Sequence, residues 1–155
     1  MVSWHLAQIN IARMVAPLDD PRLAEFVALL EPVNALADNA PGFVWRLQSP
    51  AGNATEYAYN DDPLILVNMS VWETLESLRE FTYRGSHMEV FRKRREWFLK
   101  SDLPPSCLWW IPAGQIPTVA EGRERLEYYQ QHGATPFSFW FSQPYPAPAE
   151  ALEPA

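Results

Sequence analysis

An imidazole and a guanidinium share one apolar helix face in this sequence. Residues 86–100 are predicted to form a helix, and at about 100° per residue His87 and Arg94 fall in the middle of its apolar side. Histidine can transfer protons near neutral pH, and arginine can hold an anionic or enolate oxygen. Tyr83 comes one turn before His87. These three side chains are therefore the candidate catalytic residues.

Two accounts of this helix face stay open. In the first, His87 and Arg94 line a cavity between the helix and a sheet, and aromatic side chains that include Phe91 and Trp97 enclose a flat apolar ligand. In the second, both polar residues bond to strand carbonyls or to an internal carboxylate such as Glu73, because burying an unpaired charge is costly. The first account predicts small-molecule chemistry, and the second predicts a structural network.

The hydrophobic pattern predicts the elements that would position these side chains. Strands are predicted over residues 4–13, 43–48, 64–72, 107–111 and 137–142. Helices are predicted over residues 21–40, 73–82, 86–100 and 118–132, the first continuing across Pro32. This order favours an α+β, ferredoxin-like antiparallel sheet with helices on one face.

The opposite sheet face is predicted to carry polar residues beside tryptophan, namely Gln8, Asn10, Asn68, Ser70 and Trp72. Aromatic side chains from the later strands would make this face a large apolar patch, which soluble monomers seldom tolerate. We therefore expect a second copy of the chain to cover it as a homodimer, and a solvated face is the alternative. Asn10, Asn68 and Trp72 are candidate ligand-binding residues, and Arg46 on the second strand joins them.

Length and composition restrict the class of protein. A chain of 155 residues fits one domain, which we place at residues 1–143, followed by a Pro-rich disordered tail over residues 144–155. The net charge of −7 argues against nucleic-acid binding. No apolar run approaches the roughly 20 residues of a membrane helix, and no secretory signal opens the chain. We expect a cytoplasmic protein that does not bind a membrane.

The signatures of cofactor and metal sites are missing from the sequence. It contains no Gly-rich phosphate loop, and the histidines show no metal-ligand spacing. The single cysteine, Cys107, alternates with apolar residues and is predicted to be a buried, inert thiol. We therefore expect no metal and no cofactor, with haem as the alternative considered below.

Four stretches resemble a known family. Residues 5–13, 41–47, 68–73 and 83–87 are similar to a bacterial family known only as a domain of unknown function, and the resemblance runs from Trp4 to Ser142. That family resembles the dimeric α+β-barrel superfamily, which includes the antibiotic-biosynthesis monooxygenases. The resemblance implies a ferredoxin-like sheet and a barrel formed by two subunits. Its functional implications are analogies between folds.

The superfamily suggests two activities. Its cofactor-free monooxygenases oxidise flat aromatic molecules with Asn, Trp and His or Tyr side chains. Its haem-degrading members use an Asn, a Trp and an axial His on elements comparable to those of Asn10, Trp72 and His87.

Our leading hypothesis is an aromatic-lined pocket for cofactor-independent oxygenation or proton transfer. His87 would act as acid and base, Arg94 or Arg46 as the oxyanion partner, and Asn10 and Trp72 as positioning groups. The alternatives are a haem protein with His87 as axial ligand, and a non-catalytic ligand-binding dimer. Whether the chain is an enzyme depends on which hypothesis holds.

Overall fold

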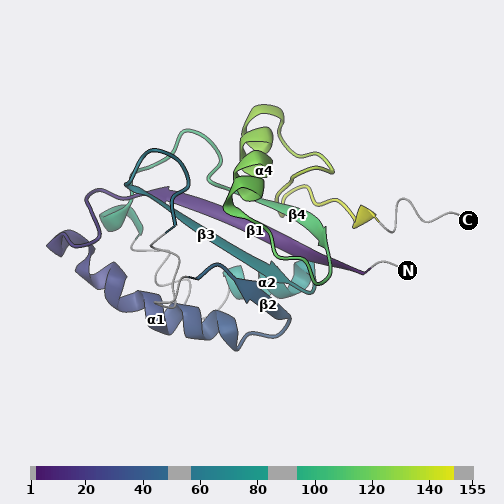
Figure 1. Cartoon of the computed structure of the whole chain (residues 1–155), viewed down its shortest axis with the longest axis horizontal. Helices are drawn as coiled ribbons and strands as arrows, with labels where there is room; N and C mark the ends of the chain where they lie inside the picture. The colour runs from purple at the N-terminus through teal and green to yellow at the C-terminus, as the bar shows by residue number, and fades with distance from the viewer. Residues whose placement is uncertain (1–2, 49–56, 84–93, 149–155) are drawn as a thin grey trace, which may run out of the picture.

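The fold is built on a four-stranded antiparallel sheet with the order β2-β3-β1-β4 (Figure 1). A computed structural model describes residues 3–48, 57–83 and 94–148 of the chain. The strands are β1 (Trp4–Arg13), β2 (Phe43–Arg46), β3 (Ile65–Trp72) and β4 (Ser106–Pro112). One helix joins β1 to β2 and another follows β3, which is the ferredoxin-like arrangement. The predicted fold class is confirmed.

The helices begin and end at the predicted signals. They are a 3₁₀ turn η1 (Pro21–Leu23) followed by α1 (Ala24–Asp38), then α2 (Leu75–Tyr83) and α4 (Val119–His132). The Asp20 side chain accepts a hydrogen bond from the backbone N–H of Arg22, and α1 continues through Pro32. The Thr118 side chain caps α4, and Gly133 ends it with a φ of +73°.

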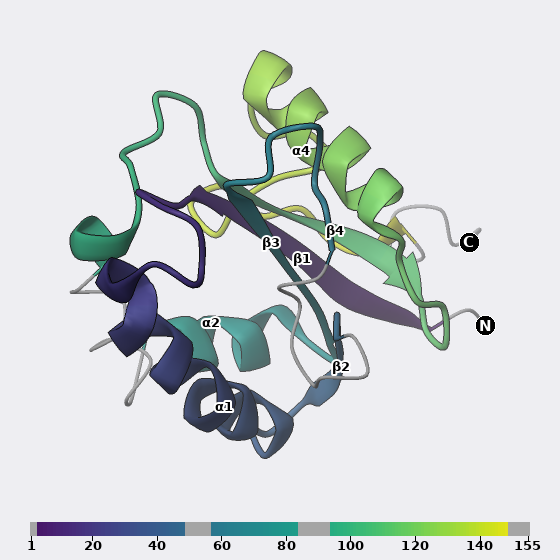
Figure 2. The ribbon, with the colours of Figure 1, turned by 60° about the vertical axis from the view of Figure 1, so that its left-hand side comes forward.

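The two faces of the sheet carry different helices. Figure 2 shows α1 and α2 on one side of the strands and α4 on the other. The prediction of helices on one face therefore holds for α1 and α2 only. These helices lie over the polar face, where the sequence predicts that a second copy of the chain covers the sheet. Formation of a homodimer stays a prediction.

Helix α4 lies close to the sheet because its inner face contains a glycine. A side chain at Gly122 would place its Cβ 2.8 Å from Ile9 Cδ1 and 3.0 Å from Met69 Cε. Such distances are too short for a Cβ, so only glycine allows this approach without displacing the neighbours. Leu126 follows one turn later and is fully buried.

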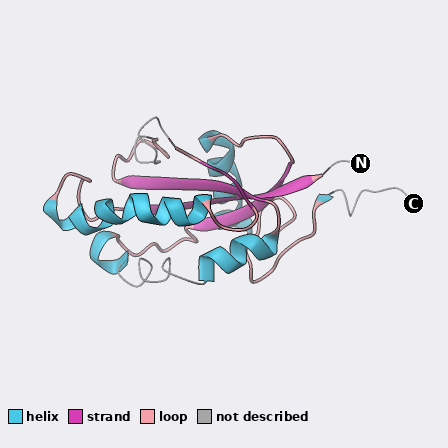
Figure 3. Cartoon of the chain, turned by 90° about the horizontal axis from the view of Figure 1, so that it is seen from below, coloured by secondary structure: helices cyan, strands magenta, loops and turns pink. Residues whose placement is uncertain are grey.

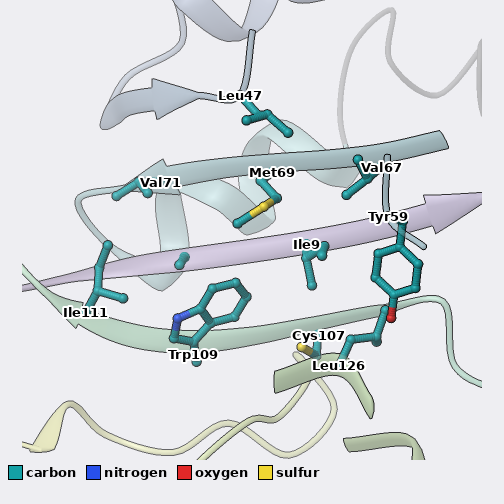
Figure 4. Close-up of a cluster of buried hydrophobic side chains, with 11 residues drawn as sticks. Ile9, Leu47, Tyr59, Val67, Met69, Val71, Cys107, Trp109, Ile111 and Leu126 are labelled. Atoms are coloured by element: carbon teal, nitrogen blue, oxygen red, sulfur yellow. The ribbon is translucent and has the colours of Figure 1, made fainter. Parts of the chain in front are cut away.

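The apolar core lies between α4 and the sheet. Alternate residues of the three longer strands point to this side, together with Leu47, Tyr59 and Leu126 (Figure 4). The strand residues of this cluster are Ala7, Ile9, Val67, Met69, Val71, Cys107, Trp109 and Ile111. Burial of this set supplies a large share of the apolar area removed from water on folding.

Two predicted elements need correction. The strand predicted over 137–142 is an isolated bridge in which Phe139 exchanges backbone hydrogen bonds of 2.7 and 2.9 Å with Leu108. A turn follows at once, because the Gln143 N–H bonds to the Trp140 carbonyl at 3.1 Å.

The helix predicted over 86–100 is described only from residue 94, and it is helical over 94–97. Phe98 then pairs with Met14, and the Leu99 N–H bonds to the Arg13 carbonyl at 2.8 Å. Pairing with the C-terminal end of β1 thus ends the helix at Trp97, earlier than predicted.

The first residues of the predicted tail pack onto the domain. The Tyr145 carbonyl accepts a 2.8 Å hydrogen bond from Trp110 Nε1, and the Tyr145 ring lies 5.8 Å from that of Phe139. Residues 149–155 lie outside the described part of the chain. In the part that is described, no helix combines the length and the apolar character that crossing a bilayer requires.

Candidate functional site

A cavity of about 570 Å³ separates the polar face of the sheet from α1 and α2. Residues of β1 and β3 form its floor, and residues of α1 form its roof. Figure 3 shows this long helix lying across the strands. The roof contributes apolar side chains, which are Phe26, Leu29, Leu30, Val33 and Ala37. A volume of this size and an apolar lining are typical of sites for small organic molecules.

A ladder of polar side chains runs along the cavity floor, and we call Asn10, Asn68, Gln8 and Ser70 the polar ladder. The strand register places Gln8 opposite Ser70 and Asn10 opposite Asn68. Gln8 Nε2 donates to both Asn68 Oδ1 and Ser70 Oγ, each at 2.8 Å. Asn10 Nδ2 donates to Gln8 Oε1 and to Asn68 Oδ1, each at 3.0 Å. The ladder is therefore held rigidly by cross-strand bonds.

The indole of Trp72 closes the inner end of the ladder. Its Nε1 donates to Ser70 Oγ at 2.8 Å, and the residue is only 1% exposed. The ring packs edge-on against Phe43 and at a tilt against Phe81 of α2. At the outer end Asn68 is exposed. The cavity floor thus changes from open and polar to closed and aromatic.

A buried cation flanks the ladder. Arg46 lies opposite Ser70 in the pairing of β2 with β3 and is 8% exposed. Its Nε donates to Asp38 Oδ1 at 2.8 Å, and a terminal nitrogen donates to Asp38 Oδ2 at 3.3 Å. This bidentate pair joins the last residue of α1 to the sheet, and it balances the charge of a guanidinium that also lines the cavity.

The roof is much less buried than the floor. None of the residues of α1 is buried, although this helix has 15 residues. Its inner side chains face the cavity, so they lack the neighbours that a packed core would supply. The Phe26 ring meets the Phe98 ring edge-on at 5.0 Å, which anchors the first turns of α1.

Most of the described candidate residues meet at this cavity. Its lining includes Asn10, Arg46, Asn68, Trp72, Tyr83 and Arg94. Tyr83 is 51% exposed, and its ring contacts that of Phe141 at 5.7 Å. Arg94 is exposed, in contrast to the inward position that the helix projection predicted. Both therefore belong to the rim.

Trp97 lies elsewhere than predicted. It is 1% exposed and packs with Met14, Ala16 and Leu23 in a separate core cluster, so it does not line the cavity. The shortened helix explains this, because Trp97 is its last residue and follows the chain into the end of β1. His87 and Phe91 lie outside the described residues, and their roles stay predictions.

Two residues of the site were absent from the sequence-based candidates. Gln8 and Ser70 form the centre of the ladder, and both are 7% exposed. The alternation of the first and third strands had placed them on the same face as Asn10 and Asn68. That alternation was the signal that could have identified Gln8 and Ser70. The sequence did not show that a cavity covers this face.

Two titratable groups on the opposite face are kept neutral by burial. Burial raises the pKa of the Cys107 thiol, and it raises the pKa of Tyr59 to about 12. Both groups are therefore neutral near pH 7, which agrees with the inert thiol predicted for Cys107. Within the described ranges, no group of three His, Cys, Asp or Glu side chains is placed to hold a metal ion.

Haem ligation depends on residues that the structure does not describe. The described lining of the cavity contains no histidine, cysteine or methionine. Because these are the usual axial ligands along with tyrosine, the fit of a haem depends on His87 or on the lining tyrosines Tyr83 and Tyr129. Haem binding through His87 stays a prediction.

Comparison with known proteins identifies a family. The family model described as "Domain of unknown function (DUF3291)" matches residues 5–154, so the chain belongs to that family. No curated protein matches the chain.

Among solved structures, similarity is found to SnoaB, a cofactor-independent oxygenase from Streptomyces nogalater, at 18% identity and a TM-score of 0.46. The match covers 72% of this chain and 95% of SnoaB. The NE2512 protein of unknown function from Nitrosomonas europaea matches at 13% identity and a TM-score of 0.46, covering 74% of this chain and 96% of that one.

Proposed function

We propose that this member of the DUF3291 family binds a flat organic molecule in the cavity between the sheet and α1. One observation carries the proposal, namely a polar ladder on the floor of a cavity whose roof is mostly apolar. Apolar walls supply affinity, and a few fixed polar groups supply orientation. A flat molecule suits the space between the sheet floor and the α1 roof, which lie on opposite sides of the cavity.

The proposed chemistry is proton transfer or cofactor-independent oxygenation of that molecule. Arg46 would stabilise negative charge that develops on a ligand oxygen, because it is a buried cation at the cavity wall. Asn10 and Trp72 would position the ligand from the two ends of the ladder. Tyr83 and Arg94 would contact it at the rim. The acid–base role of His87 lies outside the described residues.

Binding can be tested by filling the cavity from its roof. We expect 9-fluorenone, a flat tricyclic ketone, to bind at one site in isothermal titration calorimetry. Val33 lines the cavity, so Val33→Trp should weaken this binding at least tenfold. Val27 lies on the same helix but is 42% exposed and does not line the cavity, so Val27→Trp should leave binding unchanged. Equal affinity in both variants would place the ligand elsewhere and contradict the proposal.

A further inference from the structure

We infer that Ser70 is the hydrogen-bond donor that selects the ligand, and that the ligand carries an acceptor oxygen beside the Ser70 hydroxyl. Gln8 is the residue that positions this hydroxyl. The inference rests on the proposed function, because it assigns the polarity of the ligand in the same cavity. It follows from the direction of each bond in the ladder.

The Ser70 oxygen accepts both of its hydrogen bonds. An indole N–H donates and cannot accept, so Trp72 Nε1 is the donor to Ser70 Oγ. The amide nitrogen of Gln8 is likewise a donor only, and it gives the second bond to the same oxygen. A hydroxyl oxygen accepts two hydrogen bonds, so these donors use both lone pairs. Ser70 can still act only through its own hydrogen.

The hydrogen of Ser70 has no acceptor among the residues that the structure describes. The orientation of the Gln8 amide explains why, because its Nε2 faces the serine while its Oε1 points to Asn10. Arg46, the neighbour across β2 and β3, offers only donors. A buried hydroxyl without an acceptor is unfavourable, so an oxygen supplied by a ligand would complete the ladder.

The same bonds make Ser70 a stronger donor. Hydrogen bonds received by a hydroxyl polarise it and strengthen the bond that it donates. The Ser70 residue is 7% exposed, so this donor is shielded from bulk solvent. A ligand carbonyl or phenolate oxygen would therefore bind well, whereas a ligand N–H at the same place would meet a second donor.

Three tricyclic probes of nearly equal shape test the polarity. The five-membered ring of 9-fluorenone carries a carbonyl, fluorene has a methylene at that atom, and carbazole has an N–H. We expect 9-fluorenone to bind about three- to tenfold more tightly than fluorene, which is the usual contribution of one neutral hydrogen bond. Carbazole should bind most weakly. Titration calorimetry with each probe gives the order.

Variants of the ladder separate this role from a merely structural one. Ser70→Ala should remove the preference for 9-fluorenone over fluorene. Gln8→Glu should also remove it, because the introduced carboxylate accepts the serine hydrogen in place of the ligand. Gln8→Met should weaken the preference without abolishing it, since it removes one bond to Ser70 but adds no acceptor. The Gln8 pair decides the question even if Ser70→Ala does not fold, which circular dichroism will show.

The outcomes that overturn the inference differ from those that overturn the proposed function. Equal affinity for the three probes, with Val33→Trp still blocking them, would refute the role of Ser70 and leave the cavity as a binding site. An unchanged preference in Gln8→Glu would mean that Ser70 already donates to residue 8, and would also refute it. If no probe binds the parent chain, both proposals fail.

Discussion

The two faces of one sheet differ in what covers them. Under α4, Ile9, Met69 and Trp109 are fully buried and pack directly against the helix. Under α1, Gln8 and Ser70 of the same strands bond to each other below a cavity of about 570 Å³. The strands alternate between both environments at every residue. One sheet thus supplies a packed core on one side and the floor of a cavity on the other.

This difference separates the residues that stabilise the fold from those that serve the site. The face under α4 is closed by apolar contacts and requires no ligand. The face under α1 keeps its polar groups paired within the ladder, so that the cavity can exist without leaving many buried groups unsatisfied. Changes on the first face should therefore affect unfolding, and changes on the second should affect binding.

The largest expected effect is the loss of Trp109 from the packed face. This side chain is fully buried and its Nε1 donates to Glu121 at 3.1 Å. Trp109→Ala should lower the free energy of unfolding by about 3–5 kcal/mol, measured by urea denaturation. Leu30→Ala, which enlarges the existing cavity from its roof, should cost about 1 kcal/mol or less. Similar losses in the two variants would mean that the faces do not differ in packing.

A smaller effect is expected where α4 approaches the sheet. Gly122→Leu would force side-chain atoms into the space of Ile9 and Met69, so we expect a loss of about 1–3 kcal/mol in the same assay. Glu124→Leu places the same leucine side chain on the exposed side of α4 and serves as the control. A control that loses as much stability would point to helix composition instead of close packing.

The smallest expected effect is a gain in stability at Tyr59. Its hydroxyl is buried and has no hydrogen-bond partner among the described residues, so Tyr59→Phe should raise the free energy of unfolding by about 1 kcal/mol near pH 7. Because the folded pKa is about 12 and the unfolded pKa is 10.0, the parent chain should lose stability as the pH rises from 10 toward 12. The variant should lose less over that range, and denaturation at pH 7 and above pH 10 measures both.

The sequence predicts the fold well because its signals are local. The alternation of apolar and polar side chains predicted the strands, and the residue types of Asp20, Thr118 and Gly133 predicted the helix ends. The face covered by α4 was harder to predict, since it depends on the tertiary contact at Gly122. The strand predicted over 137–142 failed for the same reason, because pairing with β4 occurs only at Phe139.

The candidate site was only partly predictable. The ladder residues Asn10 and Asn68 could be found from strand alternation, and Arg46 from its place on the neighbouring strand. The position of Trp97 could not, because the helix that contains it ends where backbone groups of β1 compete for its hydrogen bonds. Periodicity also cannot distinguish a helix stripe that packs in a core from one that roofs a cavity.

The proline in the middle of α1 has a consequence for how a guest reaches the ladder. Pro32 has no amide hydrogen to give to the carbonyl of Ala28, so the helix is easiest to bend near this point. The same helix buries none of its side chains, whereas the strands beneath it are locked in register. We therefore expect a ligand to be admitted by bending of α1 near Pro32, while the strands beneath keep their register.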